Sequence, residues 1–253
     1  MTKFSANLGF LWTDLPLPEA IHAADKAGFA AVECHFPYDV NPAEVKTALD
    51  ETGLPMLGLN TRRGDVAAGD FGLAALPDRI FEARAAIDEA ITYAEAVECA
   101  SIHVMAGFSD GAEAEACFVE NIRYACEKAG ALGRIILIEP INHYDAPGYF
   151  LNKTDQAITI MDQVASPHLK LMFDCYHVQL MEGDLGNRLE KLLPNIGHIQ
   201  FASVPDRGAP DHGEVDYRHI FTLIDDLGYT GPLGAEYKPD GPTENSLLWL
   251  QND

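Results

Sequence analysis

Four short apolar runs in this chain each carry, at or near their end, a side chain whose oxygen atoms suit a hard metal ion. The donors are the carboxylates of Glu139, Asp174 and Glu236 and the side-chain amide of Gln200. Apolar runs of this length are typical of buried parallel strands, where an uncompensated carboxylate is unfavourable. Because all four donors offer oxygen, a divalent cation is the simplest compensation. The pattern therefore predicts an enzyme with a metal site.

The elements that position these donors alternate between short apolar runs and longer amphipathic ones. The predicted strands cover residues 4–11, 30–36, 55–60, 100–106, 135–141, 169–174, 196–202 and 233–237. Predicted helices between and after them include residues 19–27, 78–98, 112–132, 184–193, 217–227 and a weaker last helix at 244–250. Eight strand–helix units in about 250 residues are the expected size of a (β/α)₈ TIM barrel. We therefore predict a single TIM-barrel domain of the α/β class over residues 1–253.

A doubly wound open sheet is the alternative α/β architecture. It usually has fewer strands and often a glycine-rich phosphate loop, and neither G-x-G-x-x-G nor G-x-x-x-x-G-K-[ST] occurs here. In a barrel, all parallel strands present their carboxyl ends on one face, where barrel enzymes build their sites. Successive donors are each separated by about one strand–helix unit, so they fall on strands five to eight at equivalent heights. The barrel thus predicts that the four donors converge.

The charge of the chain limits its partners. With 17 basic and 39 acidic residues, the formal net charge is −22. Such a surface repels phosphate backbones and anionic lipid, so we expect neither nucleic acid nor membrane as a partner. The five scattered cysteines form no C-x-x-C pair, and no apolar run has the length of a signal core or a membrane span. We expect a cytoplasmic protein that acts on a small molecule, and the sequence leaves a homo-oligomer open.

Four motifs around the donors resemble the hydroxypyruvate isomerase family of xylose-isomerase-like barrels, to which tagatose epimerases are related. These motifs are Ile-Glu-Pro-Ile-Asn-His at 138–143, Phe-Asp-Cys-Tyr-His at 173–177, Gly-His-Ile-Gln at 197–200 and Glu-Tyr-Lys-Pro at 236–239. Further similarity, including Phe-Ser-Ala-Asn-Leu at 4–8 with Asn7, extends over essentially the whole chain. The resemblance implies interconversion of hydroxypyruvate and 2-hydroxy-3-oxopropanoate. It also implies Glu139 and Glu236 as the catalytic pair, and these two with Asp174 and Gln200 as the metal shell.

Such a reaction moves a proton between adjacent carbons through an enediolate, whose charge a divalent cation stabilises while a carboxylate on each side carries the proton. The oxygen-rich donor set favours Mg²⁺ or Mn²⁺ over Zn²⁺. His177 could donate a hydrogen bond to a substrate oxygen, and His103 near the end of strand four either lines the site or contacts substrate. The substrate carboxylate needs cationic partners. Candidates in the loops are Arg63, Arg207 and Lys238.

The choice of substrate is left open by departures from the family pattern. Relatives often carry Asn-Leu-Pro-Ala-Gly-Asp where residues 60–65 read Asn-Thr-Arg-Arg-Gly-Asp, and the loop 203–208 lacks an Asp-Asn pair at its start. A 2-oxo-tetronate isomerase and a ketose 3-epimerase using the same site are therefore the alternatives. A sugar- or acid-binding barrel without turnover is disfavoured by the presence of both glutamates. An endonuclease on this barrel would need a basic face and many histidine ligands.

A serine hydrolase is a more remote alternative. Residues 107–111 match G-x-S-x-G around Ser109, between a predicted strand and a predicted helix. This interpretation leaves the carboxylates of strands five, six and eight unexplained, and a Gly-Ser-Asp-Gly loop is also ordinary turn chemistry. Inhibition by EDTA without inhibition by serine-directed phosphonates would exclude it.

Overall fold

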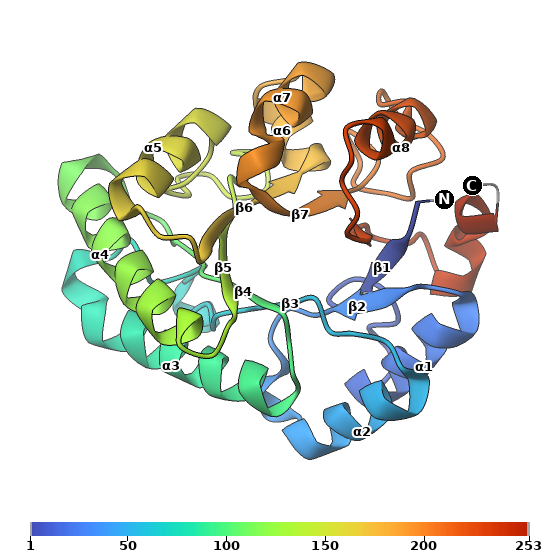
Figure 1. Ribbon diagram of the computed structural model, residues 1–253, viewed down its shortest axis with the longest axis horizontal. Helices are drawn as coiled ribbons and strands as arrows, with labels where there is room; N and C mark the ends of the chain where they lie inside the picture. The colour runs from blue at the N-terminus through green and yellow to red at the C-terminus, as the bar shows by residue number, and fades with distance from the viewer. Residues whose placement is uncertain (1, 252–253) are drawn as a thin grey trace.

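Eight short parallel strands form the inner wall of the molecule, and helices surround them on the outside (Figure 1). The computed structural model describes residues 2–251. The strands are β1 (Phe4–Asn7), β2 (Ala31–Glu33), β3 (Gly58–Asn60), β4 (Ser101–His103), β5 (Ile135–Ile138), β6 (Leu169–Asp174), β7 (Ile196–Phe201) and β8 (Leu233–Ala235). Their order in the sheet is β2-β1-β8-β7-β6-β5-β4-β3.

The remaining gap, between β2 and β3, is closed by backbone hydrogen bonds. The amide of Val32 donates to the carbonyl of Pro55 at 3.0 Å, and the amide of Leu57 donates to the carbonyl of Val32 at 2.8 Å. Val32 and Met56 form a parallel bridge. The eight strands therefore make a nearly closed barrel, and the predicted α/β barrel fold is confirmed.

The helices form an outer ring that buries its apolar side chains against the strands. They are α1 (Leu17–Ala27), α2 (Pro42–Thr52), α3 (Ile80–Ala96), α4 (Gly111–Gly130), α5 (Thr154–Val164), α6 (Cys175–Met181), α7 (Leu185–Leu192) and α8 (Tyr217–Asp226). Local sequence explains several boundaries. Gly28 ends α1 in the left-handed conformation, which glycine adopts without strain. Asn41 begins α2 by accepting a hydrogen bond from the amide of Ala43, with Pro42 as the first helical residue.

Two segments differ from the sequence-based prediction. The predicted last helix at 244–250 is wrong: the chain forms two short 3₁₀ helices, η5 (Thr243–Ser246) and η6 (Leu248–Gln251). Tertiary contacts hold this shape, because the hydroxyl of Tyr237 bonds Ser246 and the indole of Trp249 donates to that same hydroxyl. The helix α6 was not predicted, since it follows β6 directly with no turn residue between them. Its first turn is capped by Asp174, which accepts from the amide of Tyr176.

The barrel interior and the space under the helices form one continuous apolar core. All five cysteines are buried and none forms a disulfide. Within residues 2–251, no helix combines the length and the apolar character that crossing a bilayer would require.

Candidate metal and acid–base site

The carboxyl ends of β5 to β8 bring the predicted donors to one end of the barrel. Asp174 is the last residue of β6, while Glu139 and Glu236 directly follow β5 and β8. Gln200 lies on β7, opposite Asp174 in the register of β6 with β7 and opposite Gly234 in that of β7 with β8. Parallel pairing therefore fixes the common height of these side chains, as the sequence predicts.

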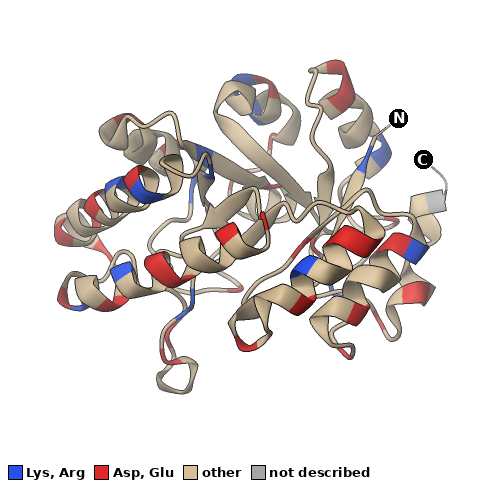
Figure 2. Cartoon of the chain, turned by 60° about the horizontal axis from the view of Figure 1, so that its bottom comes forward, with Lys and Arg blue, Asp and Glu red and all other residues tan. Residues whose placement is uncertain are grey.

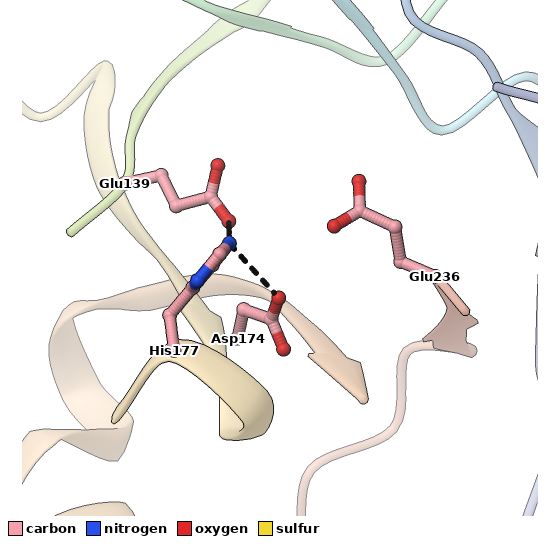
Figure 3. A group of neighbouring side chains, drawn as sticks. All are labelled: Glu139, Asp174, His177 and Glu236. Atoms are coloured by element: carbon pink, nitrogen blue, oxygen red, sulfur yellow. Dashed lines mark ion pairs between the residues drawn. The ribbon is translucent and has the colours of Figure 1, made fainter. Parts of the chain in front are cut away.

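Three carboxylates and one histidine lie close enough to share an ion. One ligand atom each from Glu139, Asp174, His177 and Glu236 lies within 4.8 Å of all the others, and all four residues are buried. Figure 3 shows the carboxylates of Glu139 and Glu236 pointing toward each other from opposite sides of the group, with Asp174 and His177 below them. A small cation or a small substrate placed between the two glutamates would contact both.

Unsatisfied oxygen atoms indicate that the site fits a cation. Among the described residues, Oε1 of Glu139, Oδ2 of Asp174 and Oε1 of Gln200 are buried without a hydrogen-bond partner. A buried acceptor without a partner is unfavourable, and a native structure rarely retains several together unless something else binds them. Three oxygen acceptors of this kind at one end of a barrel match the ligand preference of Mg²⁺ and Mn²⁺.

His177 fits the role of a hydrogen-bond donor better than that of a metal ligand. Its Nδ1 accepts from the side-chain amide of Asn142 at 2.6 Å and from the backbone amide of the same residue at 3.3 Å. Two donors on Nδ1 place the ring proton on Nε2, which lies 3.5 Å from Oδ2 of Asp174. Arg207 lies 3.4 Å from Nε2, and a hydrogen bond between them would require the ring proton on Nδ1 instead. The two donors that contact Nδ1 favour the tautomer with the proton on Nε2. Burial and Arg207 lower the pKa of His177, so the ring is neutral.

Their surroundings shift the pKa values of the two glutamates in opposite directions. Burial, followed by repulsion from Glu236 and Asp174, raises the pKa of Glu139 well above its usual range. Burial would also raise the pKa of Glu236, but the Arg207 guanidinium and a hydrogen bond from His35 outweigh that effect and lower it. Burial raises the pKa of Asp174 to about 7. The metal-free cluster therefore holds protons near neutral pH, which a cation would displace.

A cavity of about 520 Å³ opens over the cluster. Its wall includes Glu139, His177 and Glu236, the aromatic rings of Phe10, Phe36 and Phe71, and the side chains of His35, His103, Arg63, Asp145 and Arg207. Both ring nitrogens of His103 lack a hydrogen-bond partner within the described chain, and burial lowers the pKa of His103 to about 4. A neutral imidazole therefore faces the cavity, free to bond a ligand oxygen.

The predicted cationic residues differ in their surroundings. Arg207 donates to Oε2 of Glu236 at 2.5 Å and to Asp145 at 3.1 Å. Its guanidinium stacks on the rings of Phe10 and Tyr176 at 4.8 and 4.9 Å. Lys238 is exposed, does not line the cavity, and lies with its Nζ 5.7 Å from the ring of Phe10.

Asn7 and Ser109 lie outside the cavity wall as well. Asn7 is buried at the end of β1, and its side-chain amide donates a hydrogen bond to Oε1 of Glu236 at 2.8 Å, which holds the glutamate in place. Ser109 lies in the loop before α4, in a separate shallow depression with Asn152 and Gln156. Within residues 2–251, no histidine is hydrogen-bonded to Ser109. The arrangement of a hydrolytic triad is therefore missing from the described chain.

Sequence reasoning did not identify three residues that shape the site. Asn142 sets the tautomer of His177, Asp145 binds Arg207, and Glu33 at the end of β2 binds the amide of Gln200 at 2.9 Å. Asn142 and Asp145 lie three and six residues after Glu139, so proximity to a strand end could have indicated them. Glu33 lies in the middle of the predicted strand 30–36, so only the structure shows that it ends β2; a carboxylate within an apolar run was the available signal.

Comparison with known proteins agrees with this architecture. Residues 21–253 match the family described as Xylose isomerase-like TIM barrel. A 2-oxo-tetronate isomerase of Cupriavidus necator is 43% identical, with 99% of this chain and 98% of that protein covered. The hydroxypyruvate isomerase of Escherichia coli is 40% identical, with coverage of 99% and 98%. A crystal structure described as AP endonuclease, family 2, from Brucella melitensis superposes with a TM-score of 0.96 at 38% identity, covering 100% and 99% of the two chains. The chain belongs to the xylose isomerase-like TIM barrel family.

Proposed function

We propose that this protein is a metal-assisted isomerase that interconverts hydroxypyruvate and 2-hydroxy-3-oxopropanoate by proton transfer. The observation that carries the proposal is the placement of two buried glutamates on opposite sides of one centre, together with buried oxygen atoms that lack partners. The names of the two isomerase relatives, at 40% and 43% identity over nearly the full chain, support the same reaction type.

The chemistry requires one proton to leave a carbon and another to arrive at its neighbour. Glu139 and Glu236 would carry these protons on the two sides of a planar enediolate. When bound by Glu139, Asp174, Gln200 and Glu236, Mg²⁺ or Mn²⁺ would supply a Lewis acid for the enediolate charge. His177 and His103 would donate hydrogen bonds to substrate oxygens, because both rings are neutral and face the cavity.

Arg63 is the side chain best placed to bind the substrate carboxylate. Its guanidinium lines the cavity over the rings of Phe36 and Phe71, at 4.6 and 5.8 Å, and no carboxylate of the described chain pairs with it. Arg207 already binds two carboxylates, whereas Lys238 lies outside the cavity. In a chain of net charge −22, an arginine that packs over aromatic rings without a carboxylate partner attracts an anion locally.

Replacement of Arg63 by methionine is expected to raise KM for hydroxypyruvate about tenfold or more, because a charge-assisted hydrogen bond to the carboxylate is lost. Arg62→Met is the matched control. Arg62 is the preceding residue, and it pairs with Glu89 at 2.8 Å and with Asp39 at 3.4 Å. The control should change KM less than about twofold. Steady-state kinetics of both variants checks the assignment, and an unchanged KM in Arg63→Met would remove Arg63 from carboxylate binding.

A four-carbon acid is the second candidate substrate. The cavity of about 520 Å³ has room for a four-carbon acid as well as for a three-carbon one, and one relative is named 2-oxo-tetronate isomerase. The same proton transfer between adjacent carbons would serve both acids. Neutral ketoses would leave the Arg63 guanidinium without a partner, which disfavours ketose 3-epimerisation.

An endonuclease function, suggested by the description of the Brucella structure, fits this chain poorly. The net charge of −22 opposes a polyanion. In the view of Figure 2, acidic residues recur along the helices, and lysine and arginine residues are fewer. We therefore propose a small-molecule substrate, with neither nucleic acid nor membrane as a partner, and a reducing cytoplasmic location that suits the five free cysteines.

The decisive experiment is a substrate panel followed by NMR in deuterated solvent. Hydroxypyruvate, 2-oxo-tetronate and a neutral ketose would each be incubated with the protein, with and without Mg²⁺ or Mn²⁺. We expect product to form from hydroxypyruvate only when metal is present, with solvent deuterium incorporated at the carbon that receives the proton. Product without solvent deuterium would indicate a hydride shift or a shielded proton instead, and exclusive turnover of another substrate would replace the proposed one.

A further inference from the structure

A buried carboxylate on β2 lies against the candidate metal site without being part of the cluster. Glu33 is 3% exposed, and both of its carboxylate oxygens are occupied. Oε1 accepts from the hydroxyl of Ser5 at 3.0 Å, and Oε2 accepts from Nε2 of His198 at 3.0 Å and from Nε2 of Gln200 at 2.9 Å. The strand register supports this arrangement, because Gly234 of β8 lies opposite both Ser5 of β1 and Gln200 of β7 and has no side chain. Glu33 thus connects β1, β2 and β7 at the base of the site.

The contact with Glu33 determines which end of the Gln200 carboxamide faces which way. A glutamine side chain has an oxygen and an NH₂ group of nearly the same shape, so its orientation follows from its partners. One end of Gln200 contacts carboxylate oxygens of Glu33 at 2.9 Å and of Glu236 at 3.3 Å. Ionised carboxylates only accept hydrogen bonds, so this end must be the NH₂ group. The carbonyl oxygen is the other end, and it is buried without a donor.

The opposite orientation of the Gln200 carboxamide would be unfavourable at both of its ends. The carbonyl oxygen of Gln200 would then face two carboxylates, and its NH₂ group would occupy the position of the unpartnered oxygen. A divalent cation repels an NH₂ group and binds a carbonyl oxygen. Because Glu236 itself belongs to the cluster, Glu33 is the only carboxylate contacting this amide from outside it among the described residues.

The neighbouring strand leaves room for this arrangement. A Cβ atom on Gly234 of β8 would lie 2.2 Å from Oε1 of Glu33, 2.7 Å from Cγ of Gln200 and 2.9 Å from Nε2 of His198. Real Cβ atoms do not approach so closely. The glycine at this position therefore allows three polar side chains to meet in the barrel interior.

We propose that Glu33 is a positioning residue that holds the Gln200 carboxamide with its oxygen available to the divalent cation. Glu33 itself does not contact the cation; it sets metal affinity through Gln200. This inference rests on the metal-assisted isomerase proposed above. It assigns a role to a residue that takes no part in the proton transfers.

The test measures metal binding directly, on chelator-treated full-length protein titrated with Mn²⁺ and followed by electron paramagnetic resonance of the free ion. Glu33→Gln removes the constraint, because a glutamine at this position can offer either end to Gln200. We expect Mn²⁺ affinity to fall about 10- to 100-fold, the range seen when a ligand loses its supporting partner. Glu33→Asp keeps the charge but is one methylene too short to reach Gln200, and it should lose affinity as well.

A double variant that exchanges the residue types at positions 33 and 200 distinguishes a loss of positioning from general destabilisation of the fold. In the double variant Glu33→Gln with Gln200→Glu, the donor moves to position 33, and one carboxylate oxygen at position 200 accepts from it while the other stays available to the cation. This variant should recover most of the Mn²⁺ affinity that Glu33→Gln loses. Gln200→Glu alone places two carboxylates in contact and should bind worse than the pair.

Glu182→Gln is the matched structural control. The side chain of Glu182 is 7% exposed and accepts from the backbone amide of Thr154 at 2.8 Å, with Arg188 at 3.1 Å. Its replacement should lower the unfolding temperature as Glu33→Gln does, but leave Mn²⁺ affinity within about twofold.

Wild-type Mn²⁺ affinity in Glu33→Gln, or a double variant that binds no better than the single one, would overturn the positioning role. Failure of the wild-type protein to bind Mn²⁺ would instead overturn the proposed metal-assisted function. The unfolding temperature of every variant, measured by circular dichroism, shows whether it is folded. If Glu33→Gln does not fold, the comparison of Glu33→Asp with the wild type carries the same test.

Discussion

Replacement of Glu139 or Glu236 by glutamine is expected to lower turnover of hydroxypyruvate at least a hundredfold. Glutamine keeps the shape of glutamate and an oxygen for the cation, but it cannot accept or return the substrate proton. General acid–base groups typically contribute 10² to 10⁴ in rate. The measurement is kcat at saturating Mn²⁺ and substrate, with solvent deuterium incorporation followed by NMR.

Two controls distinguish loss of proton transfer from loss of the metal. Mn²⁺ affinity of each variant should be measured, and turnover compared only where the site is saturated. Glu182→Gln, which changes a buried carboxylate outside the cluster, should retain wild-type turnover. Near-normal kcat in either Glu139→Gln or Glu236→Gln would remove that residue from the acid–base role.

Removal of divalent metal is expected to abolish turnover, with Mg²⁺ or Mn²⁺ restoring it. The buried oxygens of Glu139, Asp174 and Gln200 have no donor within the described chain, so chelation leaves them unsatisfied. Adding Mn²⁺ at about a hundred times its Kd should stabilise the folded state by about 2.7 kcal/mol. For a chain of this length, that corresponds to a rise of roughly 5–10 °C in the unfolding temperature.

The same cation should bind more weakly in acid. Burial raises the pKa of Asp174 to about 7 in the metal-free protein, and the cation binds the ionised form. Mn²⁺ affinity is therefore expected to fall as the pH is lowered from 8 to 6. Full activity after exhaustive EDTA treatment, verified by elemental analysis, would contradict a metal-assisted mechanism. Serine-directed phosphonates should leave turnover unchanged, because the described chain places no histidine against Ser109.

The main lines of the fold were predictable because they depend on local patterns. Alternating apolar and amphipathic runs predict the strand–helix units, and local sequence suits the boundaries of two helices, with Gly28 at the end of α1 and Asn41 at the start of α2. The C-terminal segment was mispredicted, since the bonds of Ser246 and Trp249 to Tyr237 hold it in two short turns. An apolar pattern over so few residues does not contain that information.

The candidate site was predictable to the extent that strand ends define it. Glu139, Asp174 and Glu236 follow or end the buried strands β5, β6 and β8, and parallel pairing brings such positions together in any barrel. The sequence did not predict which of Arg63, Arg207 and Lys238 is best placed to bind the substrate carboxylate. All three lie in loops, and only the tertiary structure shows that Arg63 has no carboxylate partner, that Arg207 binds Glu236 and Asp145, and that Lys238 does not line the cavity.

By itself, the sequence determined the barrel, the family and the height at which the oxygen donors meet, because hydrophobic periodicity and strand termini are properties of short segments. Only the tertiary structure decided which atoms are left without partners, which tautomer His177 adopts and how Gln200 is oriented. Those outcomes depend on contacts such as that of Glu33 with Gln200, which lie 167 residues apart in sequence and meet only when the barrel closes. The hydrogen-bonding state of a buried polar group is set by all its neighbours at once, and no local pattern specifies them.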